Sequence, residues 1–78
     1  MLFKRKFIIE LDTIPETNED ICLAVAEYCA TYNLPFEFIK RTHPLITIID
    51  GRKYKITKCF TKVHRINLWV LRCEEIKI

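Results

Sequence analysis

Glycine is almost absent from this chain of 78 residues, in which Gly51 is the only one beside three prolines. Because glycine supplies most left-handed turn positions, so little of it predicts mainly regular structure with few tight turns. The length allows one domain, residues 1–78, and a domain of this size buries only about 60% of the surface of its unfolded chain. Half of the residues are hydrophobic, which is more than a disordered chain carries.

Short motifs that mark common classes of enzyme are also missing. The chain has no P-loop, no dinucleotide-binding glycine pattern, no nucleophile elbow and no H-E-x-x-H sequence. Its two histidines are His43, which precedes a proline, and His64, which lies in a basic segment. His64 and Cys59 could form a nucleophile pair, although nothing in their spacing requires it. We therefore expect a protein that is not an enzyme and that uses no cofactor.

The four cysteines, at positions 22, 29, 59 and 73, include no C-x-x-C pair. Cys22 and Cys29 stand seven residues apart in a predicted helix, which separates them by about 10.5 Å along the axis. A disulfide requires Cα atoms within roughly 7 Å, and one zinc ion with bonds of about 2.3 Å could not reach both sulfurs. We predict four reduced, buried thiols and no metal site.

No secretory or membrane-spanning segment is visible either. Glu10 and Asp12 interrupt the apolar run near the start of the chain, so the run is too short for a signal core or a membrane span. Together with reduced cysteines, this predicts a protein of the cytoplasm that does not bind a membrane.

The charge that is present is unevenly distributed around a net value of +3. Residues 1–39 carry three cations and seven acids, residues 40–65 carry eight cations and one acid, and residues 66–78 are balanced. A basic segment can indicate a partner with phosphates or acidic groups, but lysines also keep sheet edges soluble. The sequence leaves both interpretations open.

Hydrophobic periodicity predicts one helix and five strands. Strands are expected at residues 2–12, 36–42, 45–49, 52–60 and 66–73. The helix is expected at residues 18–33, with Thr17 or Asn18 as its N-cap and Asn33 as a left-handed residue at its end. This order, β-α-β-β-β-β, predicts a two-layer α+β sandwich in which the helix joins two parallel strands and the other strands form an antiparallel meander.

Asp50-Gly51 predicts a β-hairpin between the third and fourth strands. A two-residue turn would place Ile46 and Ile48 beside lysines. A three-residue loop with a bulge at Gly51 would instead pair Ile46 with Tyr54 and gather apolar residues on one face. We expect the bulged register, and with it the core residues Phe7, Ile9, Val25, Tyr28, Phe38, Ile46, Ile48, Ile56 and Val70.

One helix is too narrow for this sheet. Five strands span roughly 24 Å, whereas a helix is about 10–12 Å across. The last strand nevertheless has apolar residues on both faces, and we assign Ile8, Ile39, Trp69 and Leu71 to the face away from the helix. Either the sheet curls around itself, or this face meets another molecule, or one strand faces the other way.

These residues predict association with a protein, most simply a second copy of the chain in a homodimer. The expected contact residues are apolar at the centre and basic around it: Ile39, Trp69, Leu71, Lys4, Lys6, Arg41, Lys53 and Lys55. The alternative is a nucleic-acid partner, held by the basic residues 40–65 with Trp69 as a stacking platform, although no RNP-type motif is present.

Several short patterns resemble those of short bacterial domains of unknown function. They are Ile21-Cys22 at the start of the helix, Tyr28-Cys29, Phe38-Ile39-x-Arg41, Pro44 and Asp50-Gly51-x-x-Tyr54. The resemblance covers residues 7–57 and does not reach the last strand. It implies a fold type and a bacterial accessory role, and it implies no mechanism.

Overall fold

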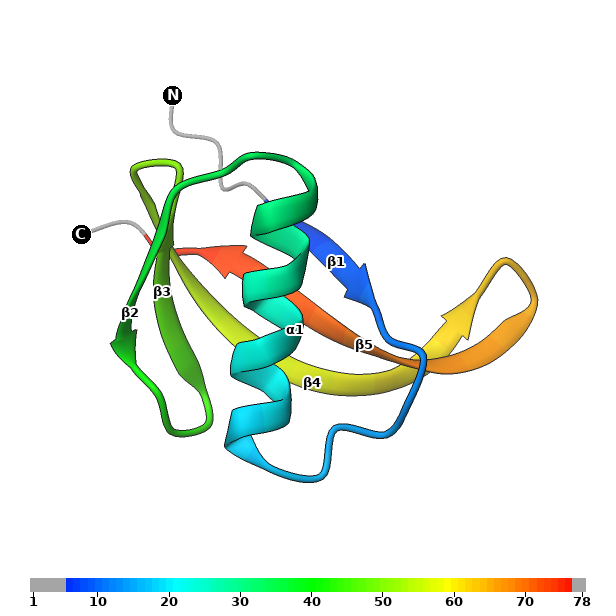
Figure 1. Ribbon diagram of the computed structural model, residues 1–78. Helices are drawn as coiled ribbons and strands as arrows, with labels where there is room; N and C mark the ends of the chain where they lie inside the picture. Colours follow the sequence, from blue (N-terminus) through cyan, green and yellow to red (C-terminus); the bar gives the residue numbers. More distant parts are fainter. Residues whose placement is uncertain (1–5, 77–78) are drawn as a thin grey trace.

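One helix and five strands make up residues 6–76, the part of the chain that this computed structural model describes (Figure 1). Their bounds are β1 Lys6–Glu10, α1 Asn18–Thr31, β2 Phe36–Lys40, β3 Leu45–Ile49, β4 Arg52–Val63 and β5 Ile66–Glu75. The five strands form a single antiparallel sheet in the order β1-β5-β4-β3-β2, with α1 against one face. The expected α+β sandwich is therefore confirmed.

Local sequence signals define both ends of α1. The Thr17 hydroxyl accepts a hydrogen bond of 3.1 Å from the backbone N–H of Asp20, whose carboxylate accepts one of 3.1 Å from the backbone N–H of Thr17. This capping box satisfies two N–H groups that the helix itself cannot pair. Asn33 has a φ of 56° and so ends the helix in the left-handed conformation, as predicted.

The helix carries the chain from one edge of the sheet to the other. Four successive antiparallel pairings lie between β1 and β2, so these two strands run in the same direction. They do not pair with each other, however, because β3, β4 and β5 lie between them. The predicted meander from β2 to β5 is confirmed.

The predicted register of the β3–β4 hairpin is wrong. Ile49 pairs with Arg52 across a two-residue turn, in which Asp50 has a φ of 51° and Gly51 a φ of 79°. Two consecutive positive values are what a type I′ turn requires. Ile46 and Ile48 consequently lie half-buried on the face away from α1, opposite Lys55 and Lys53.

Leu45, Thr47 and Ile49 face the helix in place of the isoleucines that we expected, and all three are buried. The facing of β3 was predicted wrongly because the polar Thr47 occupies a core position between two aliphatic residues. The buried cluster under α1 comprises Ile9, Ile21, Val25, Cys29, Leu45, Ile49, Tyr54, Ile56, Leu71 and Cys73.

The other expected core residues divide into three groups. Ile9, Val25 and Ile56 belong to the buried cluster, and Phe7, Tyr28 and Phe38 pack partly buried against it. Val70 is 1% exposed. It does not belong to this cluster, because its pairing with Glu10 and Cys59 places it on the opposite face of the sheet.

Thr47→Val should raise the free energy of unfolding by about 1–2 kcal/mol. The Thr47 hydroxyl is fully buried and has no hydrogen-bond partner among residues 6–76, so valine would remove an uncompensated polar group while keeping the shape of the side chain. Chemical denaturation measures the change, and Thr57→Val on the opposite face is the matched control. A loss of stability would show that the hydroxyl is paired in solution.

β4 and β5 extend beyond the rest of the sheet. Residues 61–65, which we expected to be a connection, instead complete β4 and form the tight turn of a long hairpin, with positive φ at His64 and Arg65. The last pair that β3 makes with β4 is Leu45 with Ile56, and the last that β1 makes with β5 is Glu10 with Val70. Residues 58–69 therefore form a two-stranded projection, hereafter the arm (Figure 1).

Candidate interaction surfaces

The face of the sheet away from α1, hereafter the open face, presents apolar side chains that no described residue covers. Ile8 is 42% exposed, and Ile46 and Ile48 are half-buried among lysines. Ile39, 52% exposed, lies at a bulge of the edge strand β2, where the pairing shifts between Phe38 and Lys40. The expectation that this face carries exposed apolar residues therefore holds for Ile8, whereas Ile39 is exposed at the edge of the sheet.

Leu71 and Trp69 do not belong to the open face, which corrects our assignment. Leu71 is fully buried and pairs with Ile9 on the helix side. Trp69 lies on that same side two residues earlier and packs on Phe60 across the arm, with ring centroids 5.4 Å apart. Because four consecutive residues of β5 are apolar, alternation alone could not show which pair faces α1.

The expected basic residues are divided between the two faces. Lys53 and Lys55 share the open face with Lys6, which forms an ion pair of 3.7 Å with Glu74. Glu74 also pairs in register with Lys55, so a carboxylate lies within this basic group. Arg41 instead lies over the ring of Phe38, 4.9 Å from its centroid, towards the helix side. Lys4 lies outside the described residues.

Arg41 is also close enough to α1 to influence the thiol of Cys22. Burial raises the pKa of the Cys22 thiol, and the nearby Arg41 partly offsets that rise. Arg41 therefore cannot act together with Lys53 and Lys55 on one surface.

The structure does not assemble a nucleophile pair from His64 and Cys59. Five residues of extended strand separate them, about 16 Å at the rise of a β-strand. The Cys59 sulfur instead accepts a hydrogen bond of 3.6 Å from the Arg72 guanidinium, and Nε2 of His43 accepts one of 3.4 Å from the backbone of Lys58. All four cysteines are free. Cys29 and Cys73 are buried as predicted, whereas Cys22 and Cys59 are only half-buried.

Burial controls the chemistry of the two core thiols. It raises the pKa of Cys73 to about 12, and it also raises the pKa of Cys29. Since the thiolate is the reactive form, alkylation near pH 8 should modify Cys22 and Cys59 before Cys29 and Cys73. Mass spectrometry of partly alkylated protein would measure this order, and rapid labelling of Cys73 in the folded protein would contradict it.

The same shift predicts a dependence of stability on pH. The folded-state pKa of Cys73 lies above its ordinary value of 9.0, so the folded protein holds this proton more tightly than the unfolded chain does. Its contribution is complete below about pH 9 and should be lost as the pH rises towards 12. Cys73→Ala should reduce the alkaline dependence in denaturation experiments at several pH values, and the part that remains belongs to Cys29 and Tyr28, whose pKa values burial also raises.

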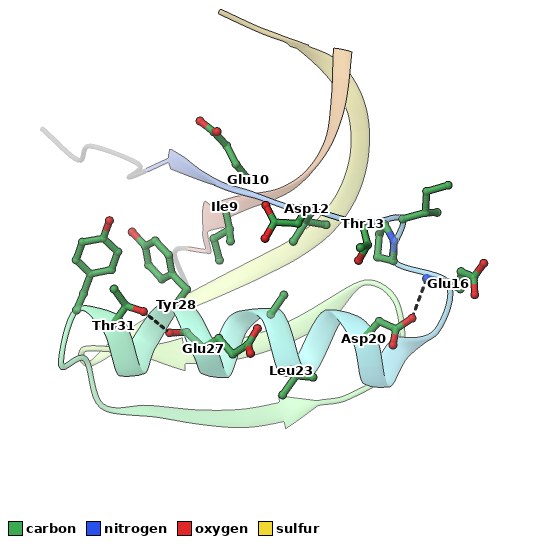
Figure 2. Close-up of a pocket in the computed structure, with 15 residues that line it drawn as sticks. Ile9, Glu10, Asp12, Thr13, Glu16, Asp20, Leu23, Glu27, Tyr28 and Thr31 are labelled. Carbon is green, nitrogen blue, oxygen red and sulfur yellow. Dashed lines mark hydrogen bonds between the residues drawn. The ribbon is translucent and has the colours of Figure 1, made fainter. Parts of the chain in front are cut away.

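A cleft of about 730 Å³ lies between α1 and the segment that leaves β1 (Figure 2). Its lining combines polar and apolar side chains in about equal measure, and the apolar ones include Ile14 and Leu23, which are 59% and 60% exposed. Asp12 on the β1 side and Glu27 on α1 stand on opposite walls. The remaining acidic residues that line it are Glu10, Glu16 and Asp20.

Within residues 6–76, no lysine, arginine or histidine lines this cleft. Among residues 6–76, ion pairs join Lys6 to Glu74 and Arg52 to Glu75. Neither ion pair involves a carboxylate of the cleft. The cleft was not predicted from the sequence, although one signal for it is present: residues 7–39 contain seven acids and no lysine, arginine or histidine. The cleft therefore combines exposed apolar side chains with a surplus of negative charge.

The arm has the opposite charge. Lys58, Phe60 and Lys62 alternate with residues of the other face, so they form one row, and Phe60 is 57% exposed. Residues 51–73, which include the arm, contain seven lysines and arginines and no acid. The backbone N–H of Leu11 donates a hydrogen bond of 3.0 Å to the carbonyl of Trp69, so the base of the arm adjoins the rim of the cleft.

No family model, curated protein or solved structure matches this chain. The resemblance to short bacterial domains of unknown function thus stays a prediction. No helix within residues 6–76 is both long enough and apolar enough to cross a membrane.

Proposed function

We propose that this protein is a non-enzymatic association module of the bacterial cytoplasm, which forms a homodimer through the open face of its sheet. The observation that carries the proposal is the apolar surface of Ile8, Ile46 and Ile48, which α1 leaves uncovered because it packs on the other face. These side chains flank the central strands of the face, with Ile8 on β1 and Ile46 and Ile48 on β3. Apolar surface that a monomer leaves exposed in this way is typical of an interface. A second copy offers the same surface, so a two-fold axis would bury both.

The charges on the open face favour a protein partner. Lys53 and Lys55 are accompanied by Glu74, and Lys6 is already paired with that same carboxylate. Charges of both signs on β4 and β5 thus lie between the apolar residues of β1 and β3, and such a mixed surface suits a protein partner better than a polyanion. The four free thiols favour a reducing compartment.

The test is the molar mass in solution, measured by light scattering at about 1 M salt, where the Debye length is about 3 Å and contacts between charges are screened. We expect a dimer of the wild-type chain and a monomer of Ile48→Glu and of Ile8→Glu. Ala30→Glu on the exposed side of α1 is the control and should stay dimeric. A monomeric wild-type chain at high micromolar concentration would refute the proposal.

Nucleic-acid binding is the second candidate, and the acid-free residues 51–73 favour it. A two-stranded ribbon such as the arm also fits the major groove of B-DNA. Binding of this kind should weaken steeply with salt, and Lys53→Glu combined with Lys55→Glu should abolish it. Titration of single- and double-stranded DNA and of RNA, followed by fluorescence anisotropy, would detect it.

A further inference from the structure

We propose that the arm of one copy binds in the acidic cleft of a second copy, a contact separate from the open-face dimer. The occupant follows from the complementary chemistry of the two surfaces. The arm presents an exposed aromatic ring between two cations, Lys58-x-Phe60-x-Lys62, and the cleft presents apolar side chains between two carboxylates, Asp12 and Glu27.

Both surfaces are incomplete within a single copy. Phe60 of the arm is 57% exposed, and Leu23 and Ile14 of the cleft are exposed to a similar degree. Neither Lys58 nor Lys62 forms an ion pair within residues 6–76, and the same holds for Asp12 and Glu27. The exposed ring and the two cations of the arm therefore complement the apolar residues and the two carboxylates of the cleft in a second molecule.

The arm does not fill the cleft of its own molecule. It leaves the rim at Trp69 and points away from α1 (Figure 1). The turn at His64 and Arg65 forms the tip of the arm, four residues from Trp69 or about 13 Å along the ribbon. An isolated two-stranded ribbon is only marginally stable in water, so this length of hairpin would gain from packing against another surface.

The proximity of the two surfaces determines the symmetry of the contact. Because Leu11 at the rim of the cleft is hydrogen-bonded to Trp69 at the base of the arm, the donor and acceptor surfaces adjoin each other in every copy. A two-fold rotation about an axis near this point would place each arm over the cleft of the other copy. The contact would then be reciprocal and closed.

Salt separates this contact from the open-face dimer, because charges are screened at high ionic strength and apolar burial is not weakened. The molar mass at about 1 M salt measures association through the open face alone, whether the protein is a monomer or a dimer under that condition. The ratio of the masses at about 10 mM and about 1 M salt, where the Debye lengths are about 30 Å and 3 Å, reports the arm and the cleft. We expect the wild-type mass to at least double at low salt.

Charge reversal tests the pairing directly. The arm variant carries Lys58→Glu with Lys62→Glu, and the cleft variant carries Asp12→Lys with Glu27→Lys. Each variant alone should keep the same mass at both salt concentrations. An equimolar mixture of the two should regain the doubling at low salt, because the acidic arm then meets the basic cleft and the basic arm meets the acidic cleft.

The mixture also shows that both variants are folded, since unfolded chains could not restore the contact. Lys40→Glu with Arg41→Glu, at the end of β2, makes the same change in net charge as the arm variant and should leave the doubling intact. A wild-type mass that does not depend on salt, or a mixture that gains no mass, would overturn the inference. Neither result would affect the open-face proposal, which depends on the high-salt mass alone.

Discussion

Leu71→Ala should lower the free energy of unfolding by about 2–5 kcal/mol, the range for removing a large aliphatic side chain from a core. Leu71 is fully buried in the cluster beneath α1 and pairs with Ile9 of β1. Alanine would leave a cavity that these neighbours can fill only partly. Since domains are stable by only about 5–15 kcal/mol, a urea titration should show a large shift of the midpoint.

Ile66→Ala is the matched control for this variant. Ile66 belongs to the same strand but is 64% exposed, so its truncation should change stability by no more than about 0.5 kcal/mol. Equal, small effects of both changes would mean that β5 faces the opposite way. In that case Leu71 would return to the open face, where the sequence alone had placed it.

Arg52→Met should lower the free energy of unfolding by about 2–3 kcal/mol. Nη1 of Arg52 lies 3.2 Å from Oε2 of Glu75, whose side chain is only 5% exposed. Removing one partner of such a pair leaves the other as a buried charge, which costs about 3–5 kcal/mol when both are buried. The Arg52 side chain is 40% exposed, so water can compensate part of the loss. Denaturation at neutral pH and moderate salt would measure the effect.

Lys53→Met is the control, because Lys53 is adjacent in the chain but points to the open face. A double-mutant cycle with Glu75→Gln then isolates the interaction between the two side chains. The double variant should lose less stability than the two single effects added together. Strict additivity would show that Arg52 and Glu75 are not coupled.

Much of the secondary structure could be predicted from the sequence. The strand at 45–49 has the predicted bounds, the helix ends two residues earlier than expected, and the turn lies at Asp50-Gly51. The extension of β4 to Val63 was missed, because the basic residues after Cys59 lack the apolar alternation that indicates a strand.

The candidate contact residues were predicted less well. Ile39, Lys53 and Lys55 lie at exposed or half-buried positions as expected, whereas Leu71 is buried and Arg41 lies on the helix side. Residues 68–71 are all apolar, so the pattern favours neither face. The cleft was not predicted because it combines the end of β1 with residues of α1 that are more than twenty positions away in the chain.

By itself the sequence determined the features that depend on a few neighbouring residues. Thr17 and Asp20 cap the helix, Asn33 ends it, and Asp50-Gly51 turns the hairpin, because each acts through its own backbone or through bonds that span three residues. The separation of acidic and basic halves is likewise a property of the chain alone.

Only the tertiary structure decided which faces of β3 and β5 are covered. Both strands carry aliphatic residues on each face, so a shift of one residue in register exchanges two nearly equivalent surfaces. The choice was made where β5 aligned Leu71 and Cys73 with Ile9 and Phe7 of β1, since only this pairing places the four side chains together under α1. That alignment joins opposite ends of the chain, and no local pattern encodes it.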